Sequence, residues 1–370
     1  MAAAQDGTTL SIATWGGAYG ESQEIAFFEP FAKETGTKIA MEVYDGSLAK
    51  IKEMIDGGNI GVDVVDVSAG TLGTLCNDGL LESIEISMLA STAGQPAEED
   101  FLDSGLSTCG VASVAWSTAI AFDRQAFKKG EPTEISALLD TARFPGKRAL
   151  PKGPRYTLEL ALLADGVEPG NVYSELATPA GADRAFAALD KIRGDILWWD
   201  SAHEPITWLL EDKAVMAAGY SGRIFRAAVG DQKRVGVIWD GQIYDVDAWA
   251  IPKGAKNKEE AKRFISFAMD PARLAAQAEL IAYGPMRKSA LQFVGKHPII
   301  DVEMKAFLPT APDNFKKALR VDGAWWGMHG EALGQRFAEW RAKAESEAAA
   351  KEAERKAKEA PPEPPSKAAP

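Results

Sequence analysis

The segment Ile243-Tyr-Asp-Val-Asp-Ala-Trp-Ala-Ile-Pro252 decides how we interpret the rest of the chain. It alternates in character, with Val246 and Ala248 on one face and Asp245 and Asp247 on the other, which is typical of a β-strand. The Pro-Lys-Gly that begins at its last residue ends the strand. Carboxylates in so apolar a run are costly to bury without partners. They are either solvated acids at a strand end or part of a ligand site, and the flanking sequence favours a ligand site.

The N-terminal part of the chain alternates between apolar strands and amphipathic helices joined by short turns. We expect, in order, strand Leu10–Trp15, helix Glu21–Thr35, strand Lys38–Tyr44, helix Ser47–Asp56, strand Val62–Val67 and helix Thr71–Asp78. This order is typical of a doubly wound α/β lobe. Ligands of such sheets bind beyond the carboxyl ends of the strands. The segments Trp15-Gly16-Gly17 and Ser68-Ala69-Gly70 follow two of those ends, so they are candidates for a site.

The middle of the chain repeats the pattern, which predicts a second lobe. Val111–Asp123 is too long for an ordinary strand, and we interpret it as the segment that leaves the first lobe for the second. The elements expected after it are strand Lys147–Leu150, helices Thr157–Asp165 and Ala182–Arg193, strand Ile196–Trp199, helix Ile206–Asp212, strands Ala214–Tyr220 and Val235–Trp239, the segment quoted above, and helices Lys258–Met269 and Pro271–Ile281.

Composition limits the classes of partner. A chain of 370 residues with 46% hydrophobic residues can bury two ordinary cores, and its net charge of −12 argues against nucleic acid or an anionic membrane. No run approaches the roughly 20 apolar residues of a transmembrane helix.

The start of the chain and its cysteines concern the compartment. Met1-Ala-Ala-Ala-Gln lacks the basic and apolar regions of a signal peptide and looks like what remains after a signal peptide is cleaved. Cys76 and Cys109 either form a disulfide or stay as two buried thiols.

Motifs for catalysis and cofactors are weak. The histidines His203, His297 and His329 lie too far apart for a metal site, and the sequence contains no G-x-S-x-G elbow. Trp15–Gly20 lacks the glycine spacing of nucleotide-binding loops, although its glycines, Gly17 among them, would let a ligand approach backbone N–H groups at a helix N-terminus. Asp245 and Asp247 share a face without a visible partner that would complete a reaction centre. We therefore expect no cofactor, no metal and no enzyme.

The C-terminal part differs in character from the lobes. Arg341–Ala360 intersperses acids and bases among alanines, with opposite charges four residues apart, which predicts a single solvated helix. The last residues, 361–370, are Pro-rich and are predicted to be disordered. Neither part shows an apolar face, so we interpret residues 331–370 as an appendage.

Four motifs carry a resemblance to a known family. They are Phe31-Ala-Lys-Glu-Thr-Gly36, Gly61-Val-Asp-Val-Val-Asp-Val-Ser68, Gly79-Leu-Leu-Glu82 and Asp247-Ala-Trp-Ala-Ile-Pro-Lys-Gly-Ala-Lys-Asn-Lys258. In this order the chain resembles periplasmic solute-binding proteins of ABC importers, in the spermidine/putrescine-binding group, from about Leu10 to about Trp326. The resemblance implies a monomeric periplasmic protein that binds a small molecule and delivers it to a permease in the inner membrane.

The resemblance also implies an architecture, the type II fold of periplasmic binding proteins. Two doubly wound α/β lobes are joined by crossing strands, and the ligand binds between them by hinge closure. Residues 8–120 and 250–330 would form the first lobe, and residues 121–249 the second. The chain would cross near Ala119–Asp123 and return near Val246–Ala250. The quoted segment then becomes a hinge strand facing the cleft, which would explain its acids and its aromatics, Tyr244 and Trp249.

Polyamine-binding members of the group surround the methylene chain with aromatics and hold the amines with carboxylates. Matched position by position, the resemblance assigns Trp15, Ser68, Tyr220, Tyr283 and Asp247 to the pocket. Tyr220 stands where a tryptophan is usual.

Two departures from the group concern charge. Where polyamine binders carry acids after Leu150, this chain has Lys152, Gly153, Arg155 and Tyr156, and Asp245 stands where an aromatic is usual. Arg223 lies in the turn after Tyr220. Bases at one end would repel an amine and suit a carboxylate. We therefore expect a carboxylate-bearing or amino-acid-like ligand, or a plain organic acid. The alternatives are an ordinary putrescine or spermidine binder, a cleft enzyme, and an interaction protein that uses the charged tail.

Overall fold

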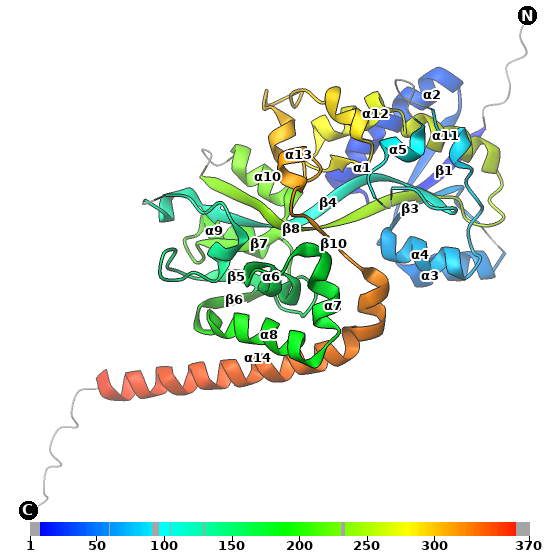
Figure 1. Ribbon diagram of the computed structural model, residues 1–370. Helices are drawn as coiled ribbons and strands as arrows, with labels where there is room; N and C mark the ends of the chain where they lie inside the picture. Colours follow the sequence, from blue (N-terminus) through cyan, green and yellow to red (C-terminus); the bar gives the residue numbers. More distant parts are fainter. Residues whose placement is uncertain are drawn as a thin grey trace, which may run out of the picture.

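The computed structural model describes residues 8–359 apart from residues 59, 91–95, 104, 129 and 231–233, with side chains up to residue 347 (Figure 1). The predictions for the first residues of the chain and for its Pro-rich end lie outside the described residues. The strands are β1 (Thr9–Thr14), β2 (Lys38–Val43), β3 (Val64–Ser68), β4 (Gly110–Asp123), β5 (Arg148–Pro151), β6 (Ile196–Trp199), β7 (Met216–Tyr220), β8 (Val235–Ala250), β9 (Gly284–Pro285) and β10 (Leu319–Arg320).

The helices follow the strands in the alternation that the sequence predicts. They are α1 (Gly17–Gln23), α2 (Glu29–Thr35), α3 (Leu48–Asp56), α4 (Ala69–Asn77), α5 (Ala97–Asp100), α6 (Thr157–Ala164), α7 (Val172–Leu176), α8 (Pro179–Asp190), α9 (Glu204–Leu210), α10 (Ser221–Gly230), α11 (Lys258–Ala268), α12 (Pro271–Leu280), α13 (Pro312–Phe315) and α14 (Gly323–Glu359). A π-helical turn at Glu24–Phe28 joins α1 to α2, where one continuous helix was expected.

All described strands belong to one mixed sheet, ordered β2-β1-β3-β8-β4-β7-β5-β6, with β10 beside β8 and β9 beside β4. The strands at each end are parallel, whereas β8 runs antiparallel to β3 and β4. We call the β2-β1-β3 end with its helices the first lobe and the β7-β5-β6 end with its helices the second lobe (Figure 1). The predicted α/β architecture with crossing strands is confirmed.

The lobes are joined along β4 and β8, which pair from end to end except at residues 239–242 of β8. Beside β4, the neighbour changes from β9 at Val114–Ala115 to β7 at Thr118 onward. Beside β8, it changes from β10 at Tyr244 to β3 at Asp247. The junction therefore lies where Trp116 faces Asp245, closer to the first lobe than the expected crossing near Ala119–Asp123.

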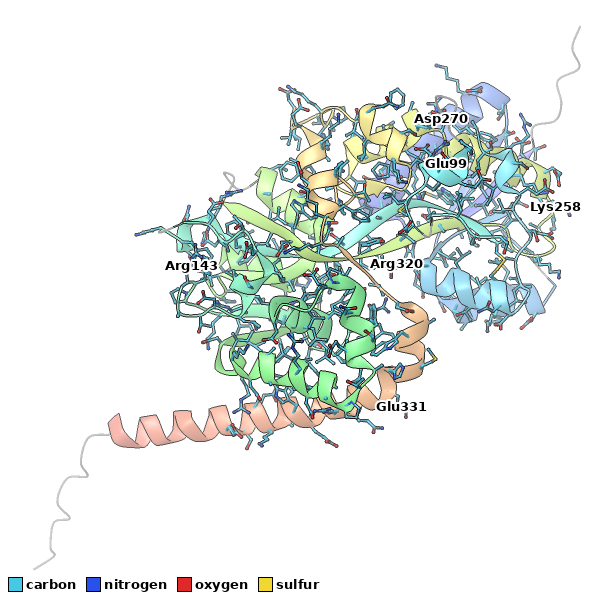
Figure 2. All side chains as sticks on the ribbon, in the orientation of Figure 1. Glu99, Arg143, Lys258, Asp270, Arg320 and Glu331 are labelled. Atoms are coloured by element: carbon cyan, nitrogen blue, oxygen red, sulfur yellow. A yellow bond between two sulfur atoms is a disulfide. The ribbon has the colours of Figure 1, made fainter. Side chains whose placement is uncertain are left out.

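A third connection was not predicted. Strand β10 runs between the lobes beside β8, pairing Leu319 with Ile243 and Arg320 with Tyr244 (Figure 2). The strands expected at 235–239 and 243–252 are a single strand, β8, which passes Gly241 with a φ of 70°.

The first-lobe core corrects one expectation about the quoted segment. Trp249 is fully buried, and its ring packs 5.5 Å from Phe264 and 6.5 Å from Phe27, centroid to centroid. Tyr244 is also buried and packs 4.9 Å from Phe315. Both aromatics therefore belong to the packed interior. Both faces of this central strand are covered by other elements. An alternating sequence pattern therefore does not show which side chains pack in the core and which line a cavity.

The second-lobe core extends to the C-terminal helix. Trp325, Trp326, Leu333 and Phe337 of α14 are buried in the same cluster as Leu160 and Phe186. Residues up to 330 were expected in the first lobe, and residues 331–370 were interpreted as an appendage; the burial of Trp325, Trp326, Leu333 and Phe337 in the second-lobe core contradicts both interpretations for this stretch. Beyond it, α14 continues past the body of the second lobe (Figure 1). Although α14 is long, the described part of the chain holds no helix apolar enough to cross a bilayer.

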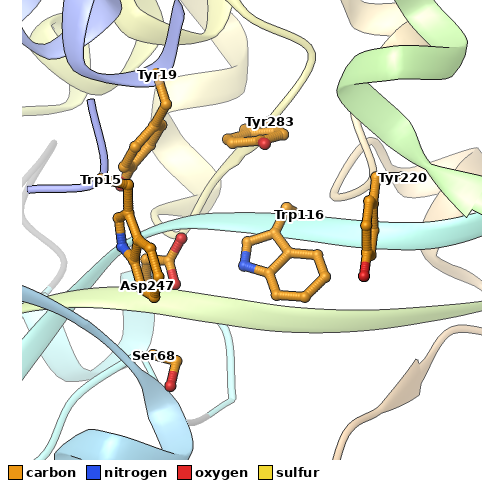
Figure 3. Close-up of a pocket in the computed structure, with 7 residues that line it drawn as sticks. All are labelled: Trp15, Tyr19, Ser68, Trp116, Tyr220, Asp247 and Tyr283. Carbon is orange, nitrogen blue, oxygen red and sulfur yellow. The ribbon is translucent and has the colours of Figure 1, made fainter. Parts of the chain in front are cut away.

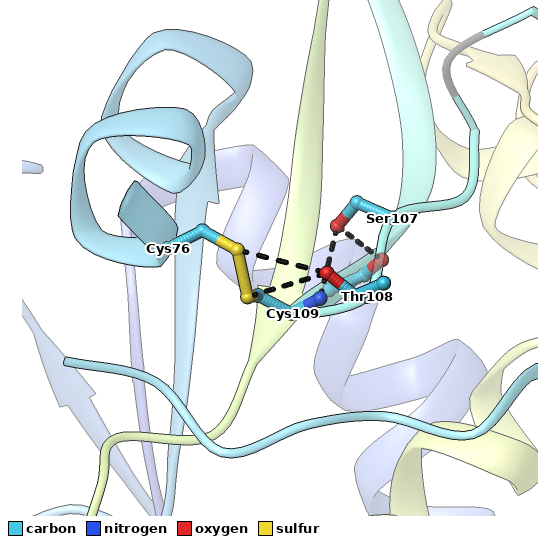
Figure 4. Close-up of a disulfide and its surroundings, with 5 residues drawn as sticks. Cys76, Ser107, Thr108 and Cys109 are labelled. Carbon is cyan, nitrogen blue, oxygen red and sulfur yellow. Dashed lines mark hydrogen bonds between the residues drawn. A yellow bond between two sulfur atoms is a disulfide. The ribbon is translucent and has the colours of Figure 1, made fainter. Parts of the chain in front are cut away.

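The two cysteines form a disulfide, which settles the alternative that the sequence left open. It joins the end of α4 to the residue before β4, and Thr108 lies against both sulfurs (Figure 4). The helix that begins at Ser68 is thereby fixed to the start of a crossing strand.

Candidate ligand-binding site

A pocket of about 270 Å³ lies where the two lobes meet (Figure 3). Trp15, Tyr19, Ser68, Trp116, Tyr220, Asp247 and Tyr283 line it. Its volume is just below the roughly 300–1,000 Å³ of sites for drug-sized ligands, so it suits a small molecule.

Strand ends position the polar and aromatic side chains. Trp15 follows β1, Ser68 ends β3 and Tyr220 ends β7. The helices α4 and α10 begin directly after Ser68 and Tyr220, so their N-termini lie beside the pocket. Free N–H groups and the helix dipole make such ends favourable for negative charge. Strand-end geometry thus brings residues from both lobes to one place, as in other α/β ligand sites.

Aromatic rings form the walls of the pocket. The ring centroids of Tyr19 and Tyr283 are 5.6 Å apart, and those of Trp116 and Tyr220 are also 5.6 Å apart. Trp15 packs over Gly46, where an added Cβ would come within 1.9 Å of the indole. Such walls bury methylene groups and attract cations through their π faces. The Tyr19 hydroxyl and the Trp15 indole N–H are buried without a hydrogen-bond partner among the described residues, and a polar ligand would supply one.

Asp247 supplies the negative charge of the pocket. Its side chain is 6% exposed, and no described cation lies within 4.0 Å of its oxygens. Burial raises the pKa of Asp247 well above its ordinary value, and the charges of Asp66 and Asp245 raise it further. A bound ammonium would relieve that repulsion, because an opposite charge favours the ionised form.

Asp66 lies on β3, two residues before Ser68, and is fully buried. Its Oδ2 accepts hydrogen bonds from Gln23 Nε2 at 2.6 Å and Thr14 Oγ1 at 3.3 Å, whereas its Oδ1 has no partner among the described residues. Burial raises the pKa of Asp66 to about 7. Because the two carboxylates interact, the charge of Asp66 also raises the pKa of Asp247.

Asp245 has a partner that Asp247 lacks. Its Oδ2 lies 3.3 Å from Nη2 of Arg155, and its Oδ1 accepts the Val246 N–H at 2.9 Å. Burial raises the pKa of Asp245, while the Val246 N–H and Arg155 act in the opposite direction. Arg155 also lies over the ring of Tyr156, 5.3 Å from its centroid. The loop at residues 152–156, which we call the basic loop, therefore neutralises an acid of β8.

The structure brings together five of the residues predicted for the site: Trp15, Ser68, Tyr220, Asp247 and Tyr283. The others predicted for it do not line this pocket; they are Gly17, Arg155, Tyr156, Arg223, Tyr244 and Asp245. Gly17 begins α1 with a φ of 58°, and Arg223 lines a neighbouring cavity. Lys152 of the basic loop pairs with Asp200 at 2.6 Å.

Two pocket residues, Tyr19 and Trp116, were missed from the sequence. Tyr19 stands in the first turn of α1, directly after the glycines that were singled out. Trp116 is the one large side chain in the run Ala112–Ala119 of a crossing strand, and that isolation was the available signal. Among the described residues, no group of three or more histidine, cysteine or acidic side chains is arranged to hold a metal.

The chain belongs to the bacterial extracellular solute-binding protein family, whose model matches residues 26–306. The γ-aminobutyric acid-binding protein of Pseudomonas aeruginosa is 39% identical over 342 residues, covering 92% of this chain and 93% of that protein. The spermidine/putrescine-binding periplasmic protein of Escherichia coli is 26% identical over 290 residues, covering 76% of this chain and 78% of that protein.

A solved structure of a GABA receptor has the same fold, with a TM-score of 0.72 and 28% identity over 90% of this chain and 98% of the other. These similarities place the protein among the substrate-binding components of ABC importers and not among enzymes. Its family also implies a periplasmic location, a small-molecule ligand and an ABC permease as partner.

Proposed function

We propose that the protein binds a small ω-amino acid of the γ-aminobutyrate type between its lobes and closes over it by hinge motion. The observation that carries the proposal is Asp247, a buried carboxylate in an aromatic pocket without a cation within 4.0 Å among the described residues. An alkylammonium fits this environment, since the carboxylate pairs with its charge and the aromatic rings cover its methylene groups.

The other end of the ligand meets positive charge. Arg223 lies in the first turn of α10, directly after Tyr220. It lines a cavity that shares Tyr220 and Tyr283 with the pocket. Beside Arg223 an ammonium group would be repelled, whereas a carboxylate is attracted by the guanidinium and by the N-terminus of α10. The ammonium would therefore bind to the first-lobe side of the cleft and the carboxylate to the second-lobe side. The relatives that bind γ-aminobutyrate support this assignment.

An ordinary polyamine-binding function is the second candidate. The polyamine-binding relative and the two acids of β8 favour it. Arg155 opposes it, because the guanidinium already neutralises Asp245. A diamine would then have one carboxylate for two ammonium groups, and an unpaired buried ammonium costs several kcal/mol.

Three ligands with the same four-carbon chain separate the candidates: γ-aminobutyrate, putrescine and succinate. We would measure each by isothermal titration calorimetry, together with the thermal unfolding midpoint of the protein. A ligand at about 100 times its Kd stabilises the folded state by about 2.7 kcal/mol, which is readily seen. We expect γ-aminobutyrate to bind most tightly. Tightest binding of putrescine would establish the polyamine function, and tightest binding of succinate would remove Asp247 from the role of ammonium anchor.

A further inference from the structure

A second, larger cavity of about 880 Å³ adjoins the pocket. Tyr19, Tyr220 and Tyr283 line both, so the tyrosines form the boundary between the pocket and what we call the outer cavity. Helices α9 and α10 of the second lobe form one wall of the outer cavity. The end of α12 and the segment at His297–Ile300 form the opposite wall, on the first lobe. The outer cavity therefore continues the same cleft beyond the pocket.

The charge of the outer cavity is opposite to that of the chain. Its lining includes Arg223, Arg226, His203 and His297 but no aspartate or glutamate among the described residues, although the whole chain carries a net charge of −12. Arg223 and Arg226 are three residues apart on α10, so they project from one face of the helix. No described acid lies within 4.0 Å of either guanidinium. Arginine forks of this kind suit carboxylates and other oxyanions.

His297 adds an oriented donor on the opposite wall. Its Nδ1 accepts a hydrogen bond from the Ile299 N–H at 3.1 Å, and its ring stacks on Phe225 with centroids 6.2 Å apart. Because Nδ1 is the acceptor, the proton of the neutral ring is on Nε2, which makes Nε2 a hydrogen-bond donor. Positive or donating groups thus face the outer cavity from both lobes.

We propose that the outer cavity binds an anionic group at the far end of a longer ligand whose amino end is held at Asp247. This rests on the proposed function and extends its ligand class from simple ω-amino acids to amino compounds elongated by an acidic substituent. Arg226 and His297, which lie outside the pocket, would bind the additional anion. Arg223 lies between the two regions along α10 and would contact the ligand where it passes the tyrosines.

The test compares two synthetic compounds of the same shape. They are γ-aminobutyrylglutamate, with two carboxylates, and its diamide, in which both carboxylates are replaced by neutral amides. We expect the diacid to bind at least about tenfold more tightly than the diamide by calorimetry, and this advantage to shrink when sodium chloride is raised, because salt screens exposed charges. Equal affinities for the two compounds would overturn the inference.

Variants assign the effect to the outer cavity. In Arg226→Gln, the ratio of the affinity for the diacid to that for the diamide is expected to fall by about tenfold, while Arg226→Lys retains part of the preference. Arg143→Gln is the matched control, since it makes the same charge change on the second lobe at a residue that does not line either cavity (Figure 2). An unchanged preference in Arg226→Gln, or an equal loss in Arg143→Gln, would contradict the inference.

γ-Aminobutyrate keeps the two proposals distinguishable. If it binds and the diacid shows no advantage, the proposed function stands and the inference fails. If γ-aminobutyrate does not bind but the diacid is preferred and the preference depends on Arg226, the simple ligand is rejected and the outer cavity is supported. Absence of binding by γ-aminobutyrate, the diacid and the diamide would overturn both.

Discussion

Arg155 and Asp245 form an ion pair between the loop after β5 in the second lobe and the crossing strand β8, with Nη2 and Oδ2 3.3 Å apart. Asp245 is buried, whereas the Arg155 side chain is 42% exposed. The pair leaves Asp247, two residues along the strand, as the acid of β8 that faces the pocket. We therefore interpret this contact as the feature that adapts the cleft to one ammonium group instead of two.

Removing the guanidinium should change the ligand preference. In Arg155→Gln, Asp245 keeps its burial but loses its cation, so a second ammonium gains a partner. We expect putrescine to bind about tenfold more tightly than to the unaltered protein, because a charged hydrogen bond contributes about 1.5–3 kcal/mol. Calorimetry with putrescine and γ-aminobutyrate measures the change. The double variant Arg155→Gln/Asp245→Asn should lose the gain, and a gain that persists in it would remove Asp245 from the explanation.

Asp247→Asn should weaken γ-aminobutyrate by more than tenfold. The substitution keeps the shape of the side chain but removes the charge that pairs with the ammonium, a loss of about 1.5–3 kcal/mol. Asp245→Asn is the neighbouring control, and its effect on γ-aminobutyrate should be smaller because that carboxylate already pairs with Arg155. Unchanged affinity in Asp247→Asn would show that the ligand binds elsewhere.

Binding should also depend on pH. Burial and the neighbouring acids raise the pKa of Asp247, so at acid pH an ammonium must displace a proton from it. Affinity for γ-aminobutyrate should therefore rise as the pH increases from about 5 towards 8, by at most about tenfold per pH unit for one proton. Calorimetry in two buffers with different ionisation enthalpies counts the proton released. Asp66→Asn should flatten the profile, and a flat profile in the unaltered protein would contradict the coupling.

Gly46→Ala should displace Trp15, although Gly46 itself does not line the pocket. Gly46 has a φ of 72°, and an added Cβ would overlap the Trp15 indole, so the ring must leave its position. We expect the affinity for γ-aminobutyrate to fall by about tenfold or more with a change in tryptophan fluorescence, since the aromatic wall is lost. Gly58→Ala is a control for the backbone, because Gly58 also has a positive φ but nothing lies within 4 Å of an added Cβ. The same loss in both variants would mean that backbone strain, not Trp15, is responsible.

The C-terminal helix should divide into a structural part and a dispensable part. Phe337 is 2% exposed and packs against Phe186 and Trp198, so Phe337→Ala should lower the free energy of unfolding by about 3–5 kcal/mol. Deletion of residues 348–370 keeps every described side chain of that core and should leave stability and ligand affinity unchanged. Urea denaturation measures both. A large loss of stability on deletion would show that the end of the chain packs on the body.

The alternating strands and helices could be predicted from the sequence because each amphipathic pattern is local. Strand β6 matches its predicted bounds, and β1, β2 and β3 lie within two residues of theirs. Strand ends pointed to Trp15 and Ser68 for the same reason. The pattern of the crossing strand pointed to Asp247, and the resemblance to polyamine binders added Tyr220 and Tyr283. The structure places all three around the pocket.

What could not be predicted depends on contacts between distant segments. Nothing local shows that Trp249 packs on Phe264 while Trp116 faces a pocket, because both are tryptophans on buried crossing strands. The ion pair of Arg155 with Asp245 joins a loop to a crossing strand 90 residues further along the chain. Without that contact in view, the loop was predicted to meet the ligand directly. The aromatics of α14 were overlooked because the charged, alanine-rich end of the helix dominated its interpretation.

The packing of α14 has a consequence for synthesis on the ribosome. The core of the second lobe includes Trp325, Trp326, Leu333 and Phe337, which are translated long after β5 and β6 and after the first-lobe strands and helices. The first lobe likewise waits for β8 and α11. Neither lobe can therefore fold to completion on a partial chain. A fragment that contains only residues 121–249 would lack α14 and expose to water the apolar surface that α14 covers. The lobes therefore cannot be separated into independently expressed fragments at those boundaries.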